Sequence, residues 1–227
     1  MTKSRTDVAK ERTLSVATGA VGTHGRSATR LVLASASKIR AQLLRDAGID
    51  FDVLPAHADE AALKEALRAE HASARDAALA LAELKAARIS AMRPDDLVLG
   101  CDQLLDCAGA WFDKAIDRVD AGRQIGLLQG RDHVLATAIC VMQAGERLWH
   151  RVEAPSLTMR QLDATAIDGY LDAAGDEVIG CVGGYRLEGI GIHLFARIEG
   201  DYFAILGLPL LPLLDFLRGQ GIGAWRS

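Results

Sequence analysis

Hydroxyls and cations gather in the segment LVLASASKIR, at Ser35, Ser37, Lys38 and Arg40. Residues 31–34 have the composition of a short buried strand, and Ser37 is a typical N-cap for a helix that begins just after it. A helix N-terminus disfavours cations unless an anion lies on its exposed N–H groups. The segment therefore predicts a phosphate or carboxylate site on a strand–turn–helix unit.

Acidic residues that could complete such a site occur at three positions. Asp102 follows the apolar run at residues 97–101, which we interpret as a strand whose C-terminal end faces a ligand crevice. There Asp102 could hold a divalent metal or act as a base toward water, although an ordinary turn or helix-cap aspartate has the same pattern. Asp59 and Glu60 are adjacent acids, which could also be a plain helix-start signal.

Three cations are candidates for contacts with an anion. Lys85 interrupts an otherwise apolar stripe at helical spacing, so its side chain either snorkels to the edge or points at an anion. Arg40 lies at the edge of an apolar helix face; the alternative is a surface arginine that pairs with Asp46. Lys114 lies in a polar loop and by itself indicates no function.

Cations around a carboxylate suit metal-assisted attack of water on a polyphosphate. The sequence contains no GxSxG nucleophile elbow, no HExxH zinc motif, no phosphate-binding Walker loop and no GxGxxG after a strand. These absences weaken a covalent serine hydrolase and a dinucleotide-binding protein. The six histidines are expected to be structural or exposed.

Strands and helices alternate after residue 30, which predicts an α/β fold in one unit over residues 30–220. Residues 1–29 are expected to be a disordered leader, and residues 221–227 a C-terminal tail. Helices are expected at residues 37–47, 59–70, 73–92, 117–129, 164–173 and 209–219. Strands are expected at residues 31–34, 51–54, 97–101, 133–142, 147–149, 153–159 and 193–198.

Composition narrows the class of partner. The formal net charge is -4 and aromatic residues make up 5% of the chain, so the sequence lacks the basic footprint and stacking residues of a nucleic-acid binder. No apolar run approaches the roughly 18 residues that span a bilayer. The four cysteines form no CxxC pair and are expected to be buried, reduced thiols. With no signal-peptide pattern, these features favour the cytoplasm.

Four separated motifs resemble the Maf family of nucleoside triphosphate pyrophosphatases, once described as septum formation inhibitors. The opening LASASKIRAQLL is similar to LASxSPRRxELL, LGCDQLL to GxDTVV or GSDQV, and ELKA around Lys85 to the family's lysine helix. The tail GYRLEGIGIHLFARIEGDYFAILGLPLLPLLDFL resembles the C-terminal signature. The likeness runs from about Leu31 to Leu217.

The resemblance implies hydrolysis between the α- and β-phosphates of a nucleoside triphosphate, with Asp102 as proton acceptor. It implies a Mg²⁺ or Mn²⁺ ion held by Asp102 and Glu60, beside Asp59. The family's phosphate-binding positions correspond to Ser35, Ser37, Arg40, Lys85 and Lys114. The implied fold is a mixed sheet with flanking helices and two lobes around a deep cleft, and a homodimer is expected.

The chain departs from the family pattern at positions that bear on the base. Lys38 and Ile39 replace the Pro and first Arg of SPRR, Gln103 replaces Thr, and Glu188 stands where the dTTP/UTP branch has Gln. Ile39, Gln103 and Glu188 correspond to specificity residues, and DQ with EGxGIxLF is closer to the 7-methyl-GTP branch. Because Ile39 matches no known branch, the base stays open. Asp113 replaces the Gly of GKP and adds an acid near the predicted phosphate site.

We therefore expect a cytoplasmic pyrophosphatase that clears a nucleoside triphosphate, such as a modified one, from the nucleotide pool. The altered SPRR and GKP motifs motivate a rival, a nucleotide-binding regulator of cell division and septum formation with little turnover. A weaker third hypothesis is a phosphatase that releases orthophosphate. The product formed from a nucleotide distinguishes all three.

Overall fold

The computed structural model describes residues 30–225 of the chain. The leader predicted at residues 1–29 lies outside the described residues, as do the last two residues of the predicted tail. The domain bounds of 30 and 220 stay a prediction.

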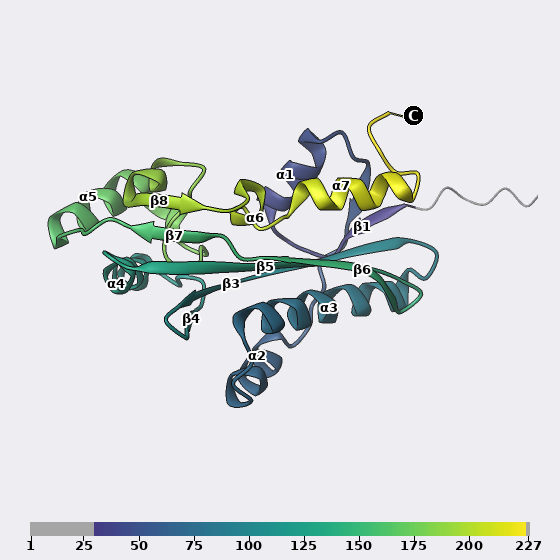
Figure 1. Cartoon of the computed structure of the whole chain (residues 1–227), viewed down its shortest axis with the longest axis horizontal. Helices are drawn as coiled ribbons and strands as arrows, with labels where there is room; N and C mark the ends of the chain where they lie inside the picture. Colours follow the sequence, from purple (N-terminus) through teal and green to yellow (C-terminus); the bar gives the residue numbers. More distant parts are fainter. Residues whose placement is uncertain (1–29, 226–227) are drawn as a thin grey trace, which may run out of the picture.

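A mixed sheet forms the centre of the molecule, and the strand order β2-β1-β3-β5-β7-β8 runs across it (Figure 1). β1 pairs in parallel with β2 and β3, whereas the remaining pairs are antiparallel, with β4 added to β3 and β6 added to β5. The strands are β1 (Leu31–Leu33), β2 (Phe51–Val53), β3 (Leu97–Cys107), β4 (Ala110–Phe112), β5 (Asp132–Gln143), β6 (Glu146–Glu153), β7 (Ser156–Met159) and β8 (Phe195–Glu199). The predicted α/β class is confirmed.

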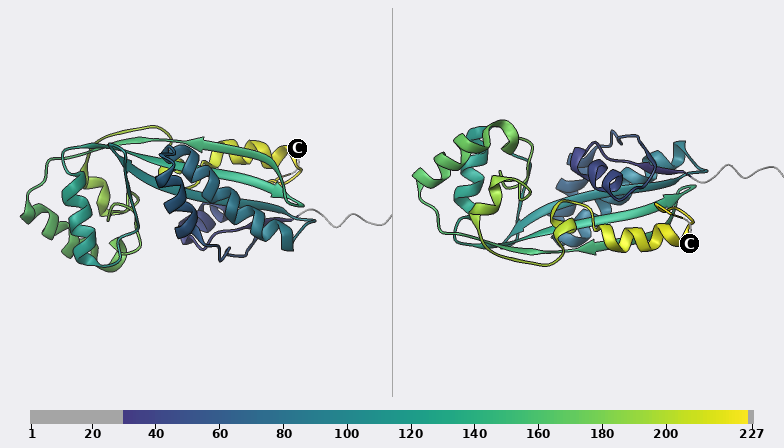
Figure 2. Two further views of the ribbon diagram at one scale, coloured as in Figure 1. Left: turned by 90° about the horizontal axis from the view of Figure 1, so that it is seen from below. Right: turned by 90° about the horizontal axis from the view of Figure 1, so that it is seen from above.

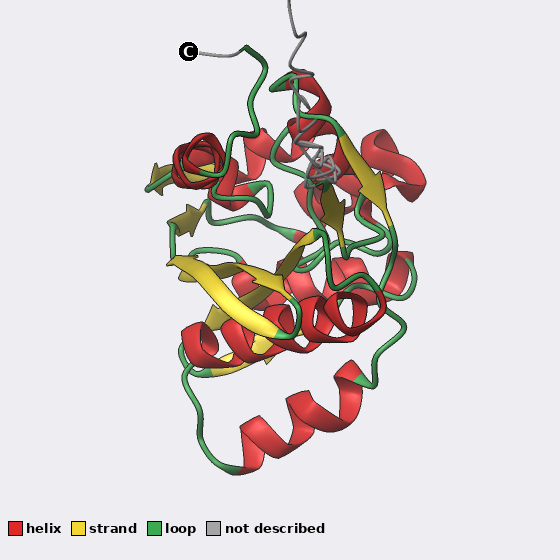
Figure 3. Cartoon of the chain, turned by 90° about the vertical axis from the view of Figure 1, so that its right-hand side faces the viewer, coloured by secondary structure: helices red, strands yellow, loops and turns green. Residues whose placement is uncertain are grey.

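The α-helices are α1 (Lys38–Asp46), α2 (Glu60–Ala69), α3 (Ala74–Met92), α4 (Arg118–Leu128), α5 (Ala164–Ala174), α6 (Tyr202–Ile205) and α7 (Leu210–Gly219). Short 3₁₀ helices occur at Gly175–Val178 and Ile190–Leu194. α1 and α7 cover one face of the sheet and α3 covers the other, while α4 and α5 lie toward the opposite end of the long strands β3 and β5 (Figures 1 and 2). Figure 3 shows α2 as the outermost helix, below α3.

Local polar residues start the predicted helices where the sequence pattern places them. Ser37, Asp59, Ser73, Asp117 and Asp163 each accept a hydrogen bond from a backbone N–H three residues later. Such caps satisfy donors that the first helical turn leaves unpaired. The six long helices therefore begin and end within about two residues of their predicted bounds.

Three apolar cores surround the strands, and β3 passes through all of them. Leu97 and Leu99 pack in the core under α1 and α7, whereas Val98 and Leu104 pack in the core under α3. Further along, Leu105 joins the core formed with α4 and α5. This alternation follows from the two-residue period of a strand, and it directs the side chain of an even-numbered residue before Leu105 toward α3.

The strand expected to end at Cys101 is longer than predicted. β3 continues to Cys107, so Asp102 lies within the strand rather than after it. The parallel partner β1 pairs only as far as Leu99, but β5 pairs with β3 from Val98 to Asp106. Asp102 thus lies just beyond the end of the parallel pairing, where the neighbouring strand β1 has already left the sheet.

Two further expectations concern cysteines and membranes. Cys101, Cys107 and Cys140 are buried free thiols as predicted, but Cys181 is only half-buried. Burial raises the pKa of Cys101 to about 11 and that of Cys140 to about 12, so both stay protonated. Between residues 30 and 225, no helix combines the length and apolar character needed to cross a membrane.

Candidate active site

A polar pocket of about 650 Å³ lies beside the segment that connects β1 to α1. It brings together the predicted site residues apart from Asp59, although their roles stay predictions. These are Ser35, Ser37, Ile39, Arg40, Glu60, Lys85, Asp102, Gln103, Lys114 and Glu188. Asp59 does not line the pocket and instead caps α2, so the helix-start alternative describes it correctly. A deep cleft between two lobes stays a prediction from the resemblance.

Lys85 forms the centre of the acidic part of the pocket. Its Nζ lies 2.6 Å from Asp102 Oδ1 and 2.8 Å from Glu60 Oε2. Lys85 and Asp102 each expose only 11% of their side chains, whereas Glu60 exposes 43%. Lys85 therefore neither snorkels to solvent nor lacks an anionic partner, because its ammonium group bridges two carboxylates of the protein. Together the three groups carry one net negative charge.

The carboxylate pair can be tested against the divalent metal that the family resemblance implies. Among the described residues, no cluster of three or more His, Cys, Asp or Glu side chains could hold a metal. Mg²⁺, however, is usually bound by one or two carboxylates plus waters and substrate phosphates rather than by an all-protein cage. Asp102 Oδ2 and Glu60 Oε1 have no hydrogen-bond partner within residues 30–225. The pair therefore fits a cation that binds together with a nucleotide.

Arg40 is the buried cation of the pocket and exposes 9% of its surface. Its Nε donates to the Gly207 carbonyl at 2.8 Å, and Nη1 donates to the Cys101 carbonyl at 2.9 Å and to Ser35 Oγ at 3.2 Å. The alternative pairing with Asp46 is wrong, since that carboxylate accepts from Gln42 instead. Neutral partners leave the charge of Arg40 uncompensated, and Nη2 has no partner in the described part of the chain.

The turn before α1 adds hydroxyl and backbone donors beside Arg40. Ser37 Oγ accepts from the Arg40 backbone N–H at 3.4 Å, and the Ser37 N–H donates to Ser35 Oγ at 3.3 Å. The helix therefore directs its N-terminus and partial positive charge into the pocket. Lys38 is exposed and also lines the pocket, so the segment can bind an anion from several sides.

Gln103 is held firmly on the face of β3 opposite Asp102. Its Nε2 donates to Thr137 Oγ1 at 2.8 Å and to the carbonyls of Ala204 and Ile205 at 3.1 and 3.0 Å. These bonds use its donors and leave Oε1 as an acceptor for a ligand. Ile39, another predicted specificity residue, is half-buried at the pocket wall.

The sequence interpretation missed Arg186 as a pocket residue. Arg186 Nε donates to Glu188 Oε1 at 3.0 Å, and its Nη1 donates to Glu177 Oε2 at 2.8 Å. The hydrogen bond and charge of Glu188 raise the pKa of Arg186 above its ordinary value. Glu188, a predicted specificity residue, therefore already has a cationic neighbour. The C-terminal motif could have indicated this residue, because Arg186 belongs to its GYRLEG part.

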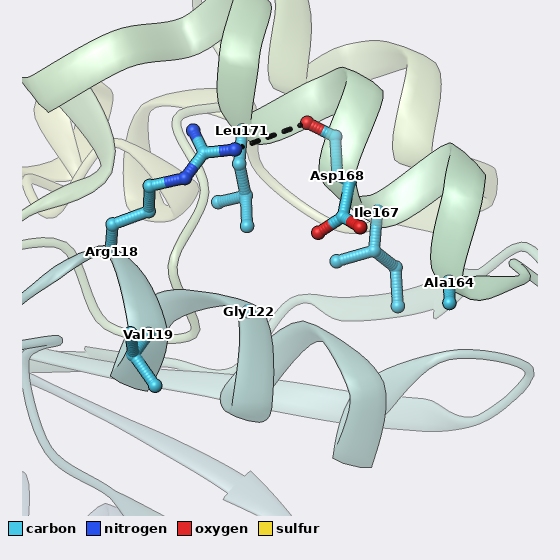
Figure 4. Close-up of a pocket in the computed structure, with 7 residues that line it drawn as sticks. All are labelled: Arg118, Val119, Gly122, Ala164, Ile167, Asp168 and Leu171. Atoms are coloured by element: carbon cyan, nitrogen blue, oxygen red, sulfur yellow. Dashed lines mark hydrogen bonds between the residues drawn. The ribbon is translucent and has the colours of Figure 1, made fainter.

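A second, mostly apolar pocket of about 380 Å³ lies between α4 and α5 (Figure 4). Arg118 borders it and donates to the Asp168 carbonyl at 3.4 Å and to Asp172 Oδ1 at 2.6 Å. No residue of the predicted site lines this pocket. The polar pocket is therefore the candidate active site.

The mixed sheet and the polar pocket define an α/β protein with a pocket in which cations and carboxylates meet. The chain belongs to the family described as Maf-like protein, which matches residues 30–220.

Curated relatives cover most of the chain. It is 53% identical over 189 residues to a nucleoside triphosphate pyrophosphatase of Granulibacter bethesdensis, which covers 83% of this chain and 96% of the relative. It is 50% identical over 190 residues to a protein of the same name from Paramagnetospirillum magneticum, covering 84% of this chain and 98% of the relative. A 7-methyl-GTP pyrophosphatase of Mesorhizobium japonicum is 45% identical over 192 residues, with 85% of this chain and 96% of the relative covered.

Proposed function

We propose that the protein is a nucleoside triphosphate pyrophosphatase, which hydrolyses a nucleoside triphosphate to a monophosphate and pyrophosphate. The observation that carries this proposal is the bridge from Lys85 to Asp102 and Glu60, in the same pocket as the unpaired charge of Arg40. An acidic group that can activate water thus lies beside groups that bind phosphate. The names of the curated relatives support the same reaction class.

Asp102 is the proposed general base, because Oδ2 is the oxygen that Lys85 leaves unoccupied. Lys85 holds the Asp102 carboxylate in place through Oδ1, so that Oδ2 can accept a proton from water. The water then attacks the α-phosphorus, and the bond from that phosphorus to the bridging oxygen breaks. Pyrophosphate leaves with that oxygen.

Other cations and hydroxyls of the pocket would contact the triphosphate and neutralise its charge. Arg40 offers Nη2, the turn before α1 offers Ser35 and Ser37, and Lys114 is exposed at the rim. Such fixed donors act most strongly where charge develops during the reaction. Asp102 and Glu60 would hold a Mg²⁺ or Mn²⁺ ion, which supplies Lewis-acid polarisation of the phosphate when bound.

The base is proposed to contact Ile39, Gln103 and Glu188. Gln103 Oε1 is an acceptor for a base N–H, and Glu188 keeps one carboxylate oxygen that Arg186 does not occupy. Acceptors of this kind suit a guanine edge, and a carboxylate favours a base that carries positive charge, as 7-methylguanine does. One of the relatives is named a 7-methyl-GTP pyrophosphatase, which supports testing that nucleotide first.

The test is a panel of common and modified nucleoside triphosphates with Mg²⁺ or Mn²⁺, with pyrophosphate and orthophosphate measured separately. We expect pyrophosphate from the wild type, and Asp102→Asn is expected to lower its release about 10²- to 10⁴-fold while nucleotide binding persists. Asp106→Asn is the matched control, because Asp106 lies on the same strand and outside the pocket.

Each alternative has its own outcome. Saturable binding without any product would favour the regulator of cell division, and orthophosphate would favour a general phosphatase. Unchanged pyrophosphate release in Asp102→Asn would show that Asp102 is not the base.

A further inference from the structure

Helix α2 is attached to the rest of the molecule by few apolar contacts. None of its residues is fully buried, and only Leu63 and Leu67 pack partly against the core under α3. The helix is the outermost element of the view in Figure 3. Its first residue is nevertheless Glu60, whose carboxylate reaches Lys85 in the pocket. The position of a pocket residue therefore depends on a helix that apolar packing holds only weakly.

A polar cluster on the next turns of α2 supplies a second attachment. Lys64 Nζ pairs with Asp113 Oδ1, and Arg68 Nη2 lies 3.1 Å from Asp113 Oδ2. The guanidinium of Arg68 also lies over the ring of Trp111, 5.7 Å from its centroid. Lys64 and Arg68 are four residues apart and share one face of the helix, so a single carboxylate accepts both.

Asp113 connects α2 with the loop that carries Lys114. The residue next to it, Lys114, lines the pocket and forms an isolated antiparallel β-bridge with Val182 through the backbone. Ala115 donates its backbone N–H to the Cys181 carbonyl. The expectation that Asp113 adds an acid near the predicted phosphate site stays a prediction. Asp113 does not line the pocket, and both of its carboxylate oxygens pair with cations of α2.

The charge of Asp113 is supported by its surroundings. Partial burial on its own would raise the pKa of Asp113, but hydrogen bonds and charges from Lys64 and Arg68 outweigh this effect and lower it. The carboxylate is thus ionised and paired at neutral pH.

We propose that Asp113 is a positioning residue. It acts as a latch between α2 and the loop after β4, and thereby holds Glu60 and Lys114 at fixed positions in the pocket. The consequence for turnover rests on the proposed function, whereas the latch itself does not. Without the latch, α2 detaches from the core more often and moves Glu60 away from Lys85. The pocket then binds a metal-bound triphosphate less well, although Asp102 and its strand are unaffected.

The latch is tested first by hydrogen exchange of the whole chain without nucleotide. Asp113→Ala is expected to speed amide exchange in residues 64–69 about fivefold, in line with the loss of two exposed ion pairs, and to leave β3 and β5 protected. Asp172→Ala is the matched control, because it removes another exposed Arg–Asp pair, on α5. Unchanged exchange in α2 would overturn the latch.

The positioning role is tested by affinity and by steady-state kinetics. An α,β-methylene nucleoside triphosphate with Mg²⁺ is expected to bind Asp113→Ala about three- to tenfold more weakly, and the KM to rise by a similar factor with little change in kcat. Lys64→Met should have a smaller effect of the same kind, and combining it with Asp113→Ala should add less than the sum. Asp113→Glu should recover part of the affinity.

The outcomes separate the two proposals. A wild type that binds the analogue but releases no pyrophosphate would refute the proposed function, yet exchange and affinity would still test the latch. Faster exchange in α2 with unchanged affinity and KM would refute positioning. Equal effects of Asp172→Ala and Asp113→Ala would also refute it, since any lost surface pair would then suffice.

Discussion

His133 is a buried histidine that should make the protein less stable in mild acid. It exposes 1% of its surface on β5, and its Nε2 lies 2.8 Å from the hydroxyl of Tyr185. Nδ1 has no hydrogen-bond partner in the described structure. Burial lowers the pKa of His133 to about 4, against a smaller raising effect from the charge of Asp132. The folded protein thus keeps this imidazole neutral.

The sign and size of the effect follow from proton linkage. The ordinary pKa of 6.5 applies in the unfolded chain, so between pH 6.5 and about 4 the unfolded state binds a proton that the folded state does not. Stability from this group is complete above pH 6.5 and declines as the pH falls. At 1.36 kcal/mol per pH unit, the total loss is about 3 kcal/mol, of which about 2.5 kcal/mol is lost by pH 4.5.

The substitution His133→Gln removes the titration and keeps a polar group that can reach Tyr185. The assay is urea unfolding of both proteins from pH 7.5 to 4.5, and the measured quantity is the difference between their free energies of unfolding. Relative to wild type, the variant should gain about 2.5 kcal/mol between pH 7.5 and 4.5, whichever protein is more stable at neutral pH. His150→Gln, at an exposed position on β6, controls for the substitution itself.

A difference that stays constant with pH would refute the reasoning. It would mean that His133 gains a proton as readily in the folded protein as in the unfolded chain. A difference of the opposite sign would mean that a charged imidazole is stabilised inside the fold.

Two further substitutions, each with a control variant, test packing and the pocket. Gly100→Ala would place a Cβ 2.1 Å from the Ala82 carbonyl oxygen, so we expect α3 to shift and the free energy of unfolding to fall by about 2–3 kcal/mol. Gly126→Ala, where nothing lies within 4 Å, should instead stabilise α4, and equal denaturation midpoints for all three proteins would contradict this prediction. Lys85→Met should lower pyrophosphate release at least about 100-fold, because Asp102 and Glu60 lose their shared cation. Arg88→Met on the exposed side of the same helix is the control, and similar rates in both variants would rule out the special role of Lys85.

Much of the fold was predictable because its signals are local. Ser37, Ser73 and Asp163 cap helices through hydrogen bonds that span three residues, and the sequence shows such caps directly. The end of β3 was not predictable in this way. Its extension beyond Asp102 depends on pairing with β5, about 35 residues further along the chain.

The candidate site was predictable in its members but not in their partners. Sequence motifs named many of the residues that line the pocket but not Arg186, because each motif used lies at the end of an element or on a single helix face. The contacts among them join distant segments, such as Lys85 with Glu60 and Arg40 with Gly207. Arg40 therefore looked like an edge residue and is buried. Asp113 was predicted near the phosphate site, and its pairing with Lys64 of α2 was not visible in the sequence.

The position of α7 has a consequence for how the chain is made. Leu210, Leu213 and Leu217 complete the core over β1 and β3, which the ribosome releases more than a hundred residues earlier. During synthesis, that apolar face of the first strands is covered only in part, by α1, until α7 emerges. Nascent chains are therefore expected to need protection by chaperones until translation is nearly complete. Losing this last helix would leave a product prone to aggregation rather than a slightly shorter enzyme.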